Sequence, residues 1–210
     1  MAPTWTAANG AAQPPNPTSQ DFTITAFPKT DIWRRDSTPE GDVFDAPYLT
    51  TSVPVSSFKS LKVEVTVPWK TQFDQGGLLI IFPEPKQGKG RWVKGGIEYF
   101  DGSPALGVVG TDRFSDWSLA PMPEGDGRTA SFEAVRDGTT LWVYVLVNGN
   151  RQALREIKWA FVDVKGDEEL KVGVYAAKPT PDEGDEKAGV EVTFSGLRVE
   201  TKSPNVEMKV

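Results

Sequence analysis

The sequence predicts an all-β protein with a sandwich or barrel architecture, and two observations support this prediction. Apolar and polar residues alternate with a period of two over short segments such as 22–27 and 61–67, which is typical of strands with one buried face. Dipeptides that favour tight hairpin turns lie between such segments: Asp101-Gly102, Asp137-Gly138 and Asn148-Gly149. No segment carries a convincing amphipathic helical pattern, and many short strands separated by turns are characteristic of sandwiches and barrels.

The predicted strands follow one another along the chain without a helix between them. Residues 77–82 form a continuous apolar run of strand length, so we expect a central strand that is covered on both faces. The segment 151–160 comes nearest to a helical pattern, but the Asn-Gly pair before it favours a strand. Beyond the two alternating segments and this run, strands are expected at residues 91–100, 105–110, 130–136, 140–147, 152–157, 170–176 and 190–199.

A chain of 210 residues suits a single domain. We expect a flexible N-terminal arm at residues 1–20, because Pro14, Pro15 and Pro17 oppose regular structure there. Residues 21–200 contain no linker that would divide them, so they are expected to form one domain. Residues 201–210 are expected to be a C-terminal tail.

The composition excludes several classes of chemistry. The chain has no cysteine and no histidine, which excludes disulfides, thiolate or imidazole metal sites, cysteine nucleophiles and Ser-His-Asp triads. The acidic segment 182–186 lacks the ligand spacing of a calcium-binding loop, so it is interpreted as a solvated charge run, and no metal or cofactor is expected. Without histidine, the free energy of unfolding is expected to vary little between about pH 6 and 8.

The charge distribution bears on partners and location. The net charge is −6 and no basic stripe is present, so nucleic acids and anionic membranes are not expected as partners. No run of about 18 apolar residues is present that would span a membrane. The absence of cysteine fits a cytoplasmic protein.

Alternation within two segments predicts which side chains share a face. In residues 91–99, Val93, Ile97 and Tyr99 fall on one face, and a second set falls on the opposite face: Trp92, Lys94 and Glu98. In residues 141–147 the valines form the expected core face, so that Trp142 and Tyr144 point outward. Large aromatic side chains on an outer face are either covered by loops or line a groove.

Three segments together resemble the regulation-of-enolase family of concanavalin A-like jelly rolls: Phe73-Asp74-Gln75-Gly76-Gly77-Leu78-Leu79, Trp92-Val93-Lys94-Gly95-Gly96-Ile97-Glu98 and Ser115-Asp116-Trp117-Ser118. Asp31-Ile32-Trp33-Arg34 and Val172-Gly173-Val174-Tyr175 match the opening and closing parts of the family pattern. The resemblance covers about residues 21–200, with Gly76 where alanine is usual. It implies a jelly-roll β-sandwich of two antiparallel sheets, one of them concave. Family members are cytosolic or are appended to glycan-active proteins, and the namesake is linked to the regulation of a glycolytic enzyme.

The candidate site is a groove on the concave sheet, in which aromatic side chains would stack on a ligand and polar ones would bind its hydroxyls. The candidate ligand-binding residues are Gln75, Trp92, Lys94, Glu98, Asp116, Trp117, Trp142 and Tyr144. Each of these residues could instead have a purely structural role. Lys94 and Glu98 would make an ordinary same-face pair, Asp116 and Trp117 would cap a turn and plug the sandwich edge, and Trp142 and Tyr144 would lie on the outer face of the other sheet.

Three functions remain open at this point. The first is a non-hydrolytic binding or regulatory module with a carbohydrate-like or small polar-aromatic ligand. The second is a cofactor-free isomerase or cyclase that uses the same groove, and the third is a regulator that docks on a metabolic enzyme. A glycoside hydrolase is disfavoured, because Glu98 has no carboxylate two residues away on its strand.

Overall fold

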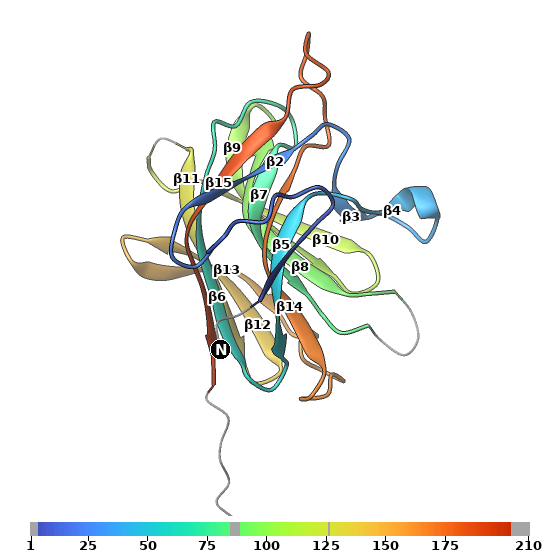
Figure 1. Ribbon diagram of the computed structural model, residues 1–210, viewed down its shortest axis with the longest axis vertical. Helices are drawn as coiled ribbons and strands as arrows, with labels where there is room; N and C mark the ends of the chain where they lie inside the picture. The colour runs from blue at the N-terminus through green and yellow to red at the C-terminus, as the bar shows by residue number, and fades with distance from the viewer. Residues whose placement is uncertain (1–3, 85–88, 126, 203–210) are drawn as a thin grey trace, which may run out of the picture.

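The computed structural model describes residues 4–84, 89–125 and 127–202, and these form two antiparallel sheets and one short hairpin (Figure 1). Within this part of the chain the helical content is one 3₁₀ turn, η1 (Pro39–Gly41). The seven-stranded sheet has the order β1 (Trp5–Ala8), β5 (Tyr48–Pro54), β14 (Glu169–Ala177), β7 (Gln75–Ile81), β8 (Trp92–Phe100), β9 (Ser103–Thr111) and β10 (Ser115–Pro121).

The second sheet has six strands, and a separate two-stranded hairpin completes the set of strands. The order in the six-stranded sheet is β13 (Asn150–Ile157), β12 (Thr140–Val147), β11 (Thr129–Asp137), β6 (Phe58–Thr66), β15 (Val190–Thr201) and β2 (Phe22–Ala26). The hairpin pairs β3 (Ile32–Arg34) with β4 (Asp42–Phe44). The prediction of an all-β protein with two antiparallel sheets is confirmed.

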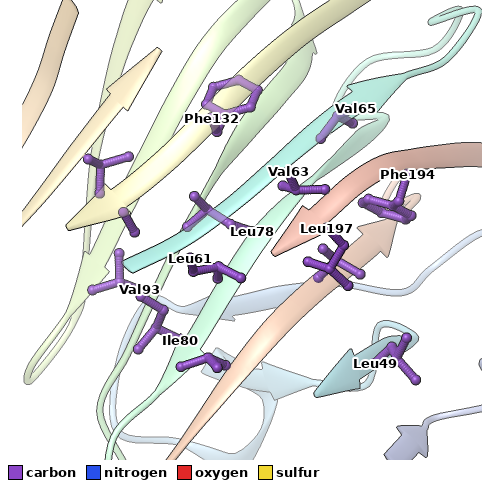
Figure 2. Packing of buried hydrophobic residues seen from close by; sticks show 14 of the residues in the cluster. Leu49, Leu61, Val63, Val65, Leu78, Ile80, Val93, Phe132, Phe194 and Leu197 are labelled. Carbon is purple, nitrogen blue, oxygen red and sulfur yellow. The ribbon is translucent and has the colours of Figure 1, made fainter. Parts of the chain in front are cut away.

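The main hydrophobic core fills the space between the two sheets. Figure 2 shows side chains of both sheets meeting there, with Leu78 and Val93 from one sheet and Leu61 and Phe132 from the other. All four are fully buried. The period-two pattern of the sequence therefore corresponds to one core-facing side of each strand.

The outer face of the seven-stranded sheet carries a second apolar cluster, which the β3–β4 hairpin covers. Its buried members are Ile32, Ala46, Leu79, Trp92, Val109, Tyr175 and Ala177. Trp33 and Phe44 from the hairpin pack against this cluster. β7 is therefore covered on both faces as predicted, with Leu78 in the main core and Leu79 in the second cluster.

Tight turns occur where hairpin dipeptides predicted them. Asp101 and Gly102 have φ angles of 50° and 82°, and Asn148 and Gly149 have φ angles of 51° and 78°. Two successive positive φ angles are the mark of a type I′ turn, which matches the twist of the strands on either side. These two turns fix the registers of β8 with β9 and of β12 with β13.

The prediction of an N-terminal arm without regular structure is wrong for residues 5–8. These residues form β1, which pairs with β5 at the edge of the seven-stranded sheet. Trp5 is buried in the main core, and Asn9 Nδ2 donates hydrogen bonds to the carbonyl oxygens of Phe44 and Ala46 at 3.1 and 3.0 Å. The prolines at 14–17 follow this strand and so do not interrupt it.

At the other end of the chain, β15 continues to Thr201, and the rest of the predicted tail, residues 203–210, lies outside the described residues. The described part of the chain has no helix with the length and apolar character needed to cross a membrane.

Candidate functional site

Lys94 is the centre of a polar cluster on the outer face of the seven-stranded sheet. The side chain is only 2% exposed. Its Nζ donates hydrogen bonds to Gln75 Oε1 at 2.7 Å and to Asp31 Oδ1 at 3.2 Å. Because a buried ammonium without partners would be costly, these two acceptors compensate for its burial.

Three aromatic rings surround the Lys94 ammonium. Nζ lies 6.0 Å from the ring centroid of Trp33, 6.0 Å from that of Trp92 and 5.5 Å from that of Tyr175. The negative faces of such rings attract a cation, and more strongly when water is excluded. The cluster therefore combines a fixed positive charge with apolar surface.

Strand pairing explains why Gln75 reaches Lys94. In the register of β7 with β8, Gln75 lies opposite Glu98, which shares a face of β8 with Lys94. Gln75 Oε1 also accepts a hydrogen bond from the Tyr175 hydroxyl at 3.2 Å, and its Nε2 donates to the Phe73 carbonyl oxygen at 3.3 Å. The amide is thereby held in one orientation.

Glu98 is the second charged group of the cluster and is only 9% exposed. Burial raises its pKa to about 7, the nearby Lys94 ammonium opposes this rise, and the Asp31 carboxylate adds to it. The Glu98 carboxyl and the Trp117 indole meet above Gly107. A Cβ at Gly107 would lie 3.2 Å from Glu98 Oε2 and 3.4 Å from Trp117 Nε1, so glycine leaves the space that these two groups occupy.

Two indole N–H groups near the cluster lack an acceptor. Trp92 Nε1 and Trp117 Nε1 are both buried without a hydrogen-bond partner among the described residues. Trp117 Nε1 faces the Glu98 carboxyl and helps to stabilise its charged form, but it does not reach hydrogen-bond geometry. Buried donors are normally paired, so these two N–H groups are unusual in having no acceptor within the cluster.

A rim of half-buried aromatic side chains borders the cluster beside Glu98. The Trp117 ring lies edge-on to Trp33 at 6.2 Å, to Phe73 at 6.4 Å and to Phe100 at 5.2 Å between centroids. Together these four rings form the aromatic rim. Trp117 lies in the edge strand β10, but it packs on the outer face of the sheet and contacts the polar cluster there, so it does not plug the edge of the sandwich as the structural alternative predicted.

The pKa of Glu98 predicts a pH dependence that the absence of histidine did not suggest. Glu98 has an ordinary pKa of 4.5 and a pKa of about 7 in the fold, so the folded state binds more protons between these values. The free energy of unfolding should therefore fall as the pH rises from about 4.5 to 7, by about 3 kcal/mol for the whole shift. Urea unfolding across this range measures the effect.

Glu98→Gln is the matched variant for this pH prediction, because glutamine keeps the shape of the side chain and cannot ionise. It should remove the fall between pH 4.5 and 7 and be more stable than the wild type at pH 8. Parallel pH profiles for the two proteins would show that Glu98 is not the titrating group.

The structure brings together Gln75, Trp92, Lys94, Glu98 and Trp117, but two expectations about them are corrected. Trp92 was expected to line a groove, whereas it is 2% exposed beneath the β3–β4 hairpin. Lys94 and Glu98 also do not bond to each other as an ordinary same-face pair, since the Lys94 ammonium bonds to Gln75 and Asp31.

Three other candidate residues lie elsewhere. Trp142 and Tyr144 belong to β12 of the six-stranded sheet, where they stack on each other at 6.0 Å on the outer face. Their expected place in the Lys94 groove is wrong, because the neighbouring Val143 and Val145 occupy the core between the sheets. Asp116 is exposed and pairs with Arg155, which joins β10 to β13.

Three residues of the cluster were not among the candidates: Asp31, Trp33 and Tyr175. Asp31 precedes β3 and Tyr175 lies in β14, far from Lys94 in the sequence. The signal that could have found them is their position inside the segments that carry the family resemblance.

A second buried charged cluster forms at one end of the sandwich and corrects the interpretation of the acidic segment 182–186. Lys178 Nζ lies 2.9 Å from Asp74 Oδ1 and 2.6 Å from Asp182 Oδ1. Lys70 Nζ and the Thr71 hydroxyl also bond to Asp182. Asp182 is therefore buried and paired, and its partners hold the pKa of its carboxyl far below the usual range.

Metal ligation was not expected from the sequence. The described residues contain no group of three or more aspartate or glutamate side chains arranged to hold a metal ion.

A comparison with protein families shows a match over almost the whole chain. The model of the family described as "Protein of unknown function (DUF1349)" matches residues 5–202. The chain belongs to the DUF1349 family. The matched range includes β1, in agreement with the place of that strand in the seven-stranded sheet.

Two curated relatives of this DUF1349 protein come from fungi. The "Uncharacterized protein AN7484" of Emericella nidulans is 38% identical over 183 residues, which is 86% of each chain. "Regulation of enolase protein 1" of Saccharomyces cerevisiae is 33% identical over 98 residues, which is 47% of this chain and 46% of that protein. The resemblance to regulation-of-enolase proteins is thus confirmed.

Solved structures confirm the jelly-roll fold. A crystal structure of "a functionally unknown protein" from Saccharomyces cerevisiae has a TM-score of 0.72 at 24% identity, and the match covers 95% of this chain and 97% of that chain. "Xyloglucan PUL GH43B" from Bacteroides ovatus has a TM-score of 0.61 at 12% identity over 94% of this chain and 36% of that chain. At these identities the likeness concerns the fold alone.

Proposed function

We propose that this DUF1349 protein binds a small polyhydroxylated ligand of the carbohydrate class at the Lys94 cluster. The observation that carries the proposal is the buried Lys94 ammonium, held by Gln75 and Asp31 among three aromatic rings. A buried charged network contributes little to stability compared with apolar packing. Aromatic surface with a few fixed polar groups and a perturbed carboxyl is, by contrast, typical of ligand sites.

Each part of the cluster has a role toward such a ligand. The half-buried faces of Trp33 and Trp117 would pack against the C–H face of a sugar ring. Asp31 and Glu98 would accept hydrogen bonds from hydroxyl groups. A ligand would approach from the side of Asp31 and the aromatic rim, where side chains are partly exposed.

The arrangement of carboxylates favours binding over hydrolysis. Asp31 Oδ1 already accepts hydrogen bonds from the Ile32 backbone N–H at 2.7 Å and from Lys94 Nζ at 3.2 Å. These two contacts fix Asp31 as a hydrogen-bond acceptor at the edge of the cluster, which suits the binding of a hydroxyl group. The name of the yeast relative supports a regulatory consequence of binding, with a metabolic enzyme as the partner that would respond.

Trp33→Ala tests the proposal, because it removes a half-buried ring of the site without touching the core between the sheets. Glucose, galactose and their disaccharides are titrated into the protein while the tryptophan indole N–H resonances are followed by NMR. We expect at least one saccharide to shift the Trp92 and Trp117 resonances, and Trp33→Ala to weaken its binding about tenfold or more.

Trp142→Ala is the matched control, since it removes a half-buried tryptophan from the outer face of the other sheet. It should bind the saccharide as the wild type does. Equal losses in both variants, or no shift with any saccharide, would contradict the proposed site or its ligand class.

A second candidate function is cofactor-free acid–base catalysis at the same site, such as an isomerisation or cyclisation. The specific observation in its favour is the Glu98 pKa of about 7 beside a fixed ammonium, which lets one carboxyl both take up and release a proton at neutral pH. Glu98→Gln would then bind a saccharide normally but form no product from it, as NMR of the incubated sugar would show. Unchanged sugar with the wild-type protein would contradict catalysis on that substrate.

A further inference from the structure

A hollow of about 620 Å³ lies apart from the Lys94 cluster, where several connecting segments meet. Its walls come from the residues after β3, the two ends of the β7–β8 connection, the β9–β10 turn and residues 163–168. This volume is in the range of pockets that hold small metabolites. None of the Lys94 cluster residues lines it.

Arg91 is the residue of this hollow whose bonding is incomplete. The side chain is only 14% exposed, and its guanidinium stands over the rings of Phe82 and Trp159 at 5.8 and 5.6 Å. Nε is buried without an acceptor among the described residues. Nη1 makes a long contact of 3.4 Å with the Trp159 carbonyl oxygen.

The ion pair that Arg91 makes is weak as well. Within the described chain, the carboxylate that pairs with Arg91 is Asp112, at 3.8 Å and with a side chain that is 57% exposed. A solvent-exposed partner at this distance is largely screened and contributes little. Arg91 is therefore a cation fixed by two aromatic rings with part of its hydrogen-bonding capacity unused.

Arg34 is the second buried arginine of the hollow, and its guanidinium is better hydrogen-bonded than that of Arg91. Its Nε donates to Asp42 Oδ1 at 2.7 Å and its Nη1 to the Gly90 carbonyl oxygen at 2.9 Å. Among the acidic residues of the lining, Glu84, Asp112 and Asp163 are exposed. The half-buried Asp36 is bonded to Arg35 and Thr38, and the half-buried Glu168 accepts from the Lys165 backbone N–H. The inner wall thus carries the weakly compensated charge of Arg91.

We propose that this hollow is a second ligand site, which binds a small anionic metabolite through a carboxylate or phosphate group placed on Arg91. The planar guanidinium fork presents Nε–H and an Nη–H side by side, which matches two oxygens of such a group. The stacked rings hold the fork in place, so little side-chain freedom is lost when the anion binds. Phosphate and carboxylate share this chemistry, and the test separates them.

The experiment follows the arginine Nε–H resonances of the full chain by NMR during separate titrations with inorganic phosphate and with acetate. The resonance of Arg91 is the one that disappears in Arg91→Lys. We expect it to shift and saturate with at least one of the two anions, which identifies the group that is bound. Arg91→Lys, which keeps the charge but loses the fork, should bind that anion about tenfold more weakly in calorimetry.

Arg151→Lys is the matched control, because Arg151 is an exposed arginine bonded to Glu133 on the six-stranded sheet. It should bind the anion as the wild type does, and so should Trp33→Ala, because Trp33 does not line the hollow. Failure of the saccharide experiment therefore leaves this proposal unaffected. An unmoved Arg91 resonance in the wild type, or an equal shift with chloride at the same ionic strength, would overturn it.

Discussion

Lys178→Met is expected to lower the free energy of unfolding by about 3–5 kcal/mol, because it removes one partner from a buried ion cluster. Lys178 is 1% exposed, and its Nζ bonds to Asp74 and Asp182, which are buried with it. Methionine fills a similar volume but leaves Asp74 buried without a cation, whereas Lys70 still pairs with Asp182 at 2.8 Å. Urea unfolding at neutral pH measures the loss.

Lys187→Met is the control for this effect, since Lys187 is an exposed residue of the same connecting segment. It should change the free energy of unfolding by less than about 0.5 kcal/mol. The pH provides a second check. The depressed pKa of Asp182 stabilises the fold above its unfolded pKa of about 4, and this contribution is lost as the pH falls below that value. A difference between wild type and Lys178→Met that stayed constant down to pH 3 would contradict an ionic cause.

The sequence pattern predicted the strands that have one clean buried face and missed those that do not. β6 alternates between buried and exposed residues from Leu61 to Val65, and this part of it was predicted. β5 was not predicted. Its Thr50 and Thr51 are adjacent polar residues that are both buried, so the sequence of this strand does not alternate between apolar and polar residues. β10 is partly exposed on both faces, and β1, β3 and β4 have only three or four residues, too few to show a period.

Alternation also decides which residues of one strand share a face, but it does not decide which strands lie side by side. Trp92, Lys94 and Glu98 were correctly placed on the same face of β8, opposite to Ile97. Tyr175 joins them only because β14 pairs with β7, which in turn pairs with β8. The outward direction of Trp142 and Tyr144 was likewise correct, yet they belong to the other sheet, which depends on the long-range pairing of β11 with β6.

Trp92→Ala is expected to lower the free energy of unfolding by about 3–5 kcal/mol, as for a tryptophan in a core. The ring lies edge-on to Phe44 of the covering hairpin at 6.1 Å and packs with Ile32 and Leu79. Its removal would leave a cavity between the hairpin and the sheet, which the paired strands cannot close. Equilibrium unfolding in urea, with the slope compared to that of the wild type, measures the loss.

Ile97→Ala provides the comparison from the opposite face of the same strand. Ile97 is fully buried in the main core, so its truncation should cost about 2–5 kcal/mol. Comparable losses in the two variants would mean that β8 is buried equally on both faces and that the hairpin is an integral layer of the fold. A loss below about 1 kcal/mol for Trp92→Ala alone would mean that the hairpin does not stay closed over Trp92 in solution. The ring would then be open to a ligand directly, whereas a closed hairpin restricts the approach to the side of Asp31 and the aromatic rim.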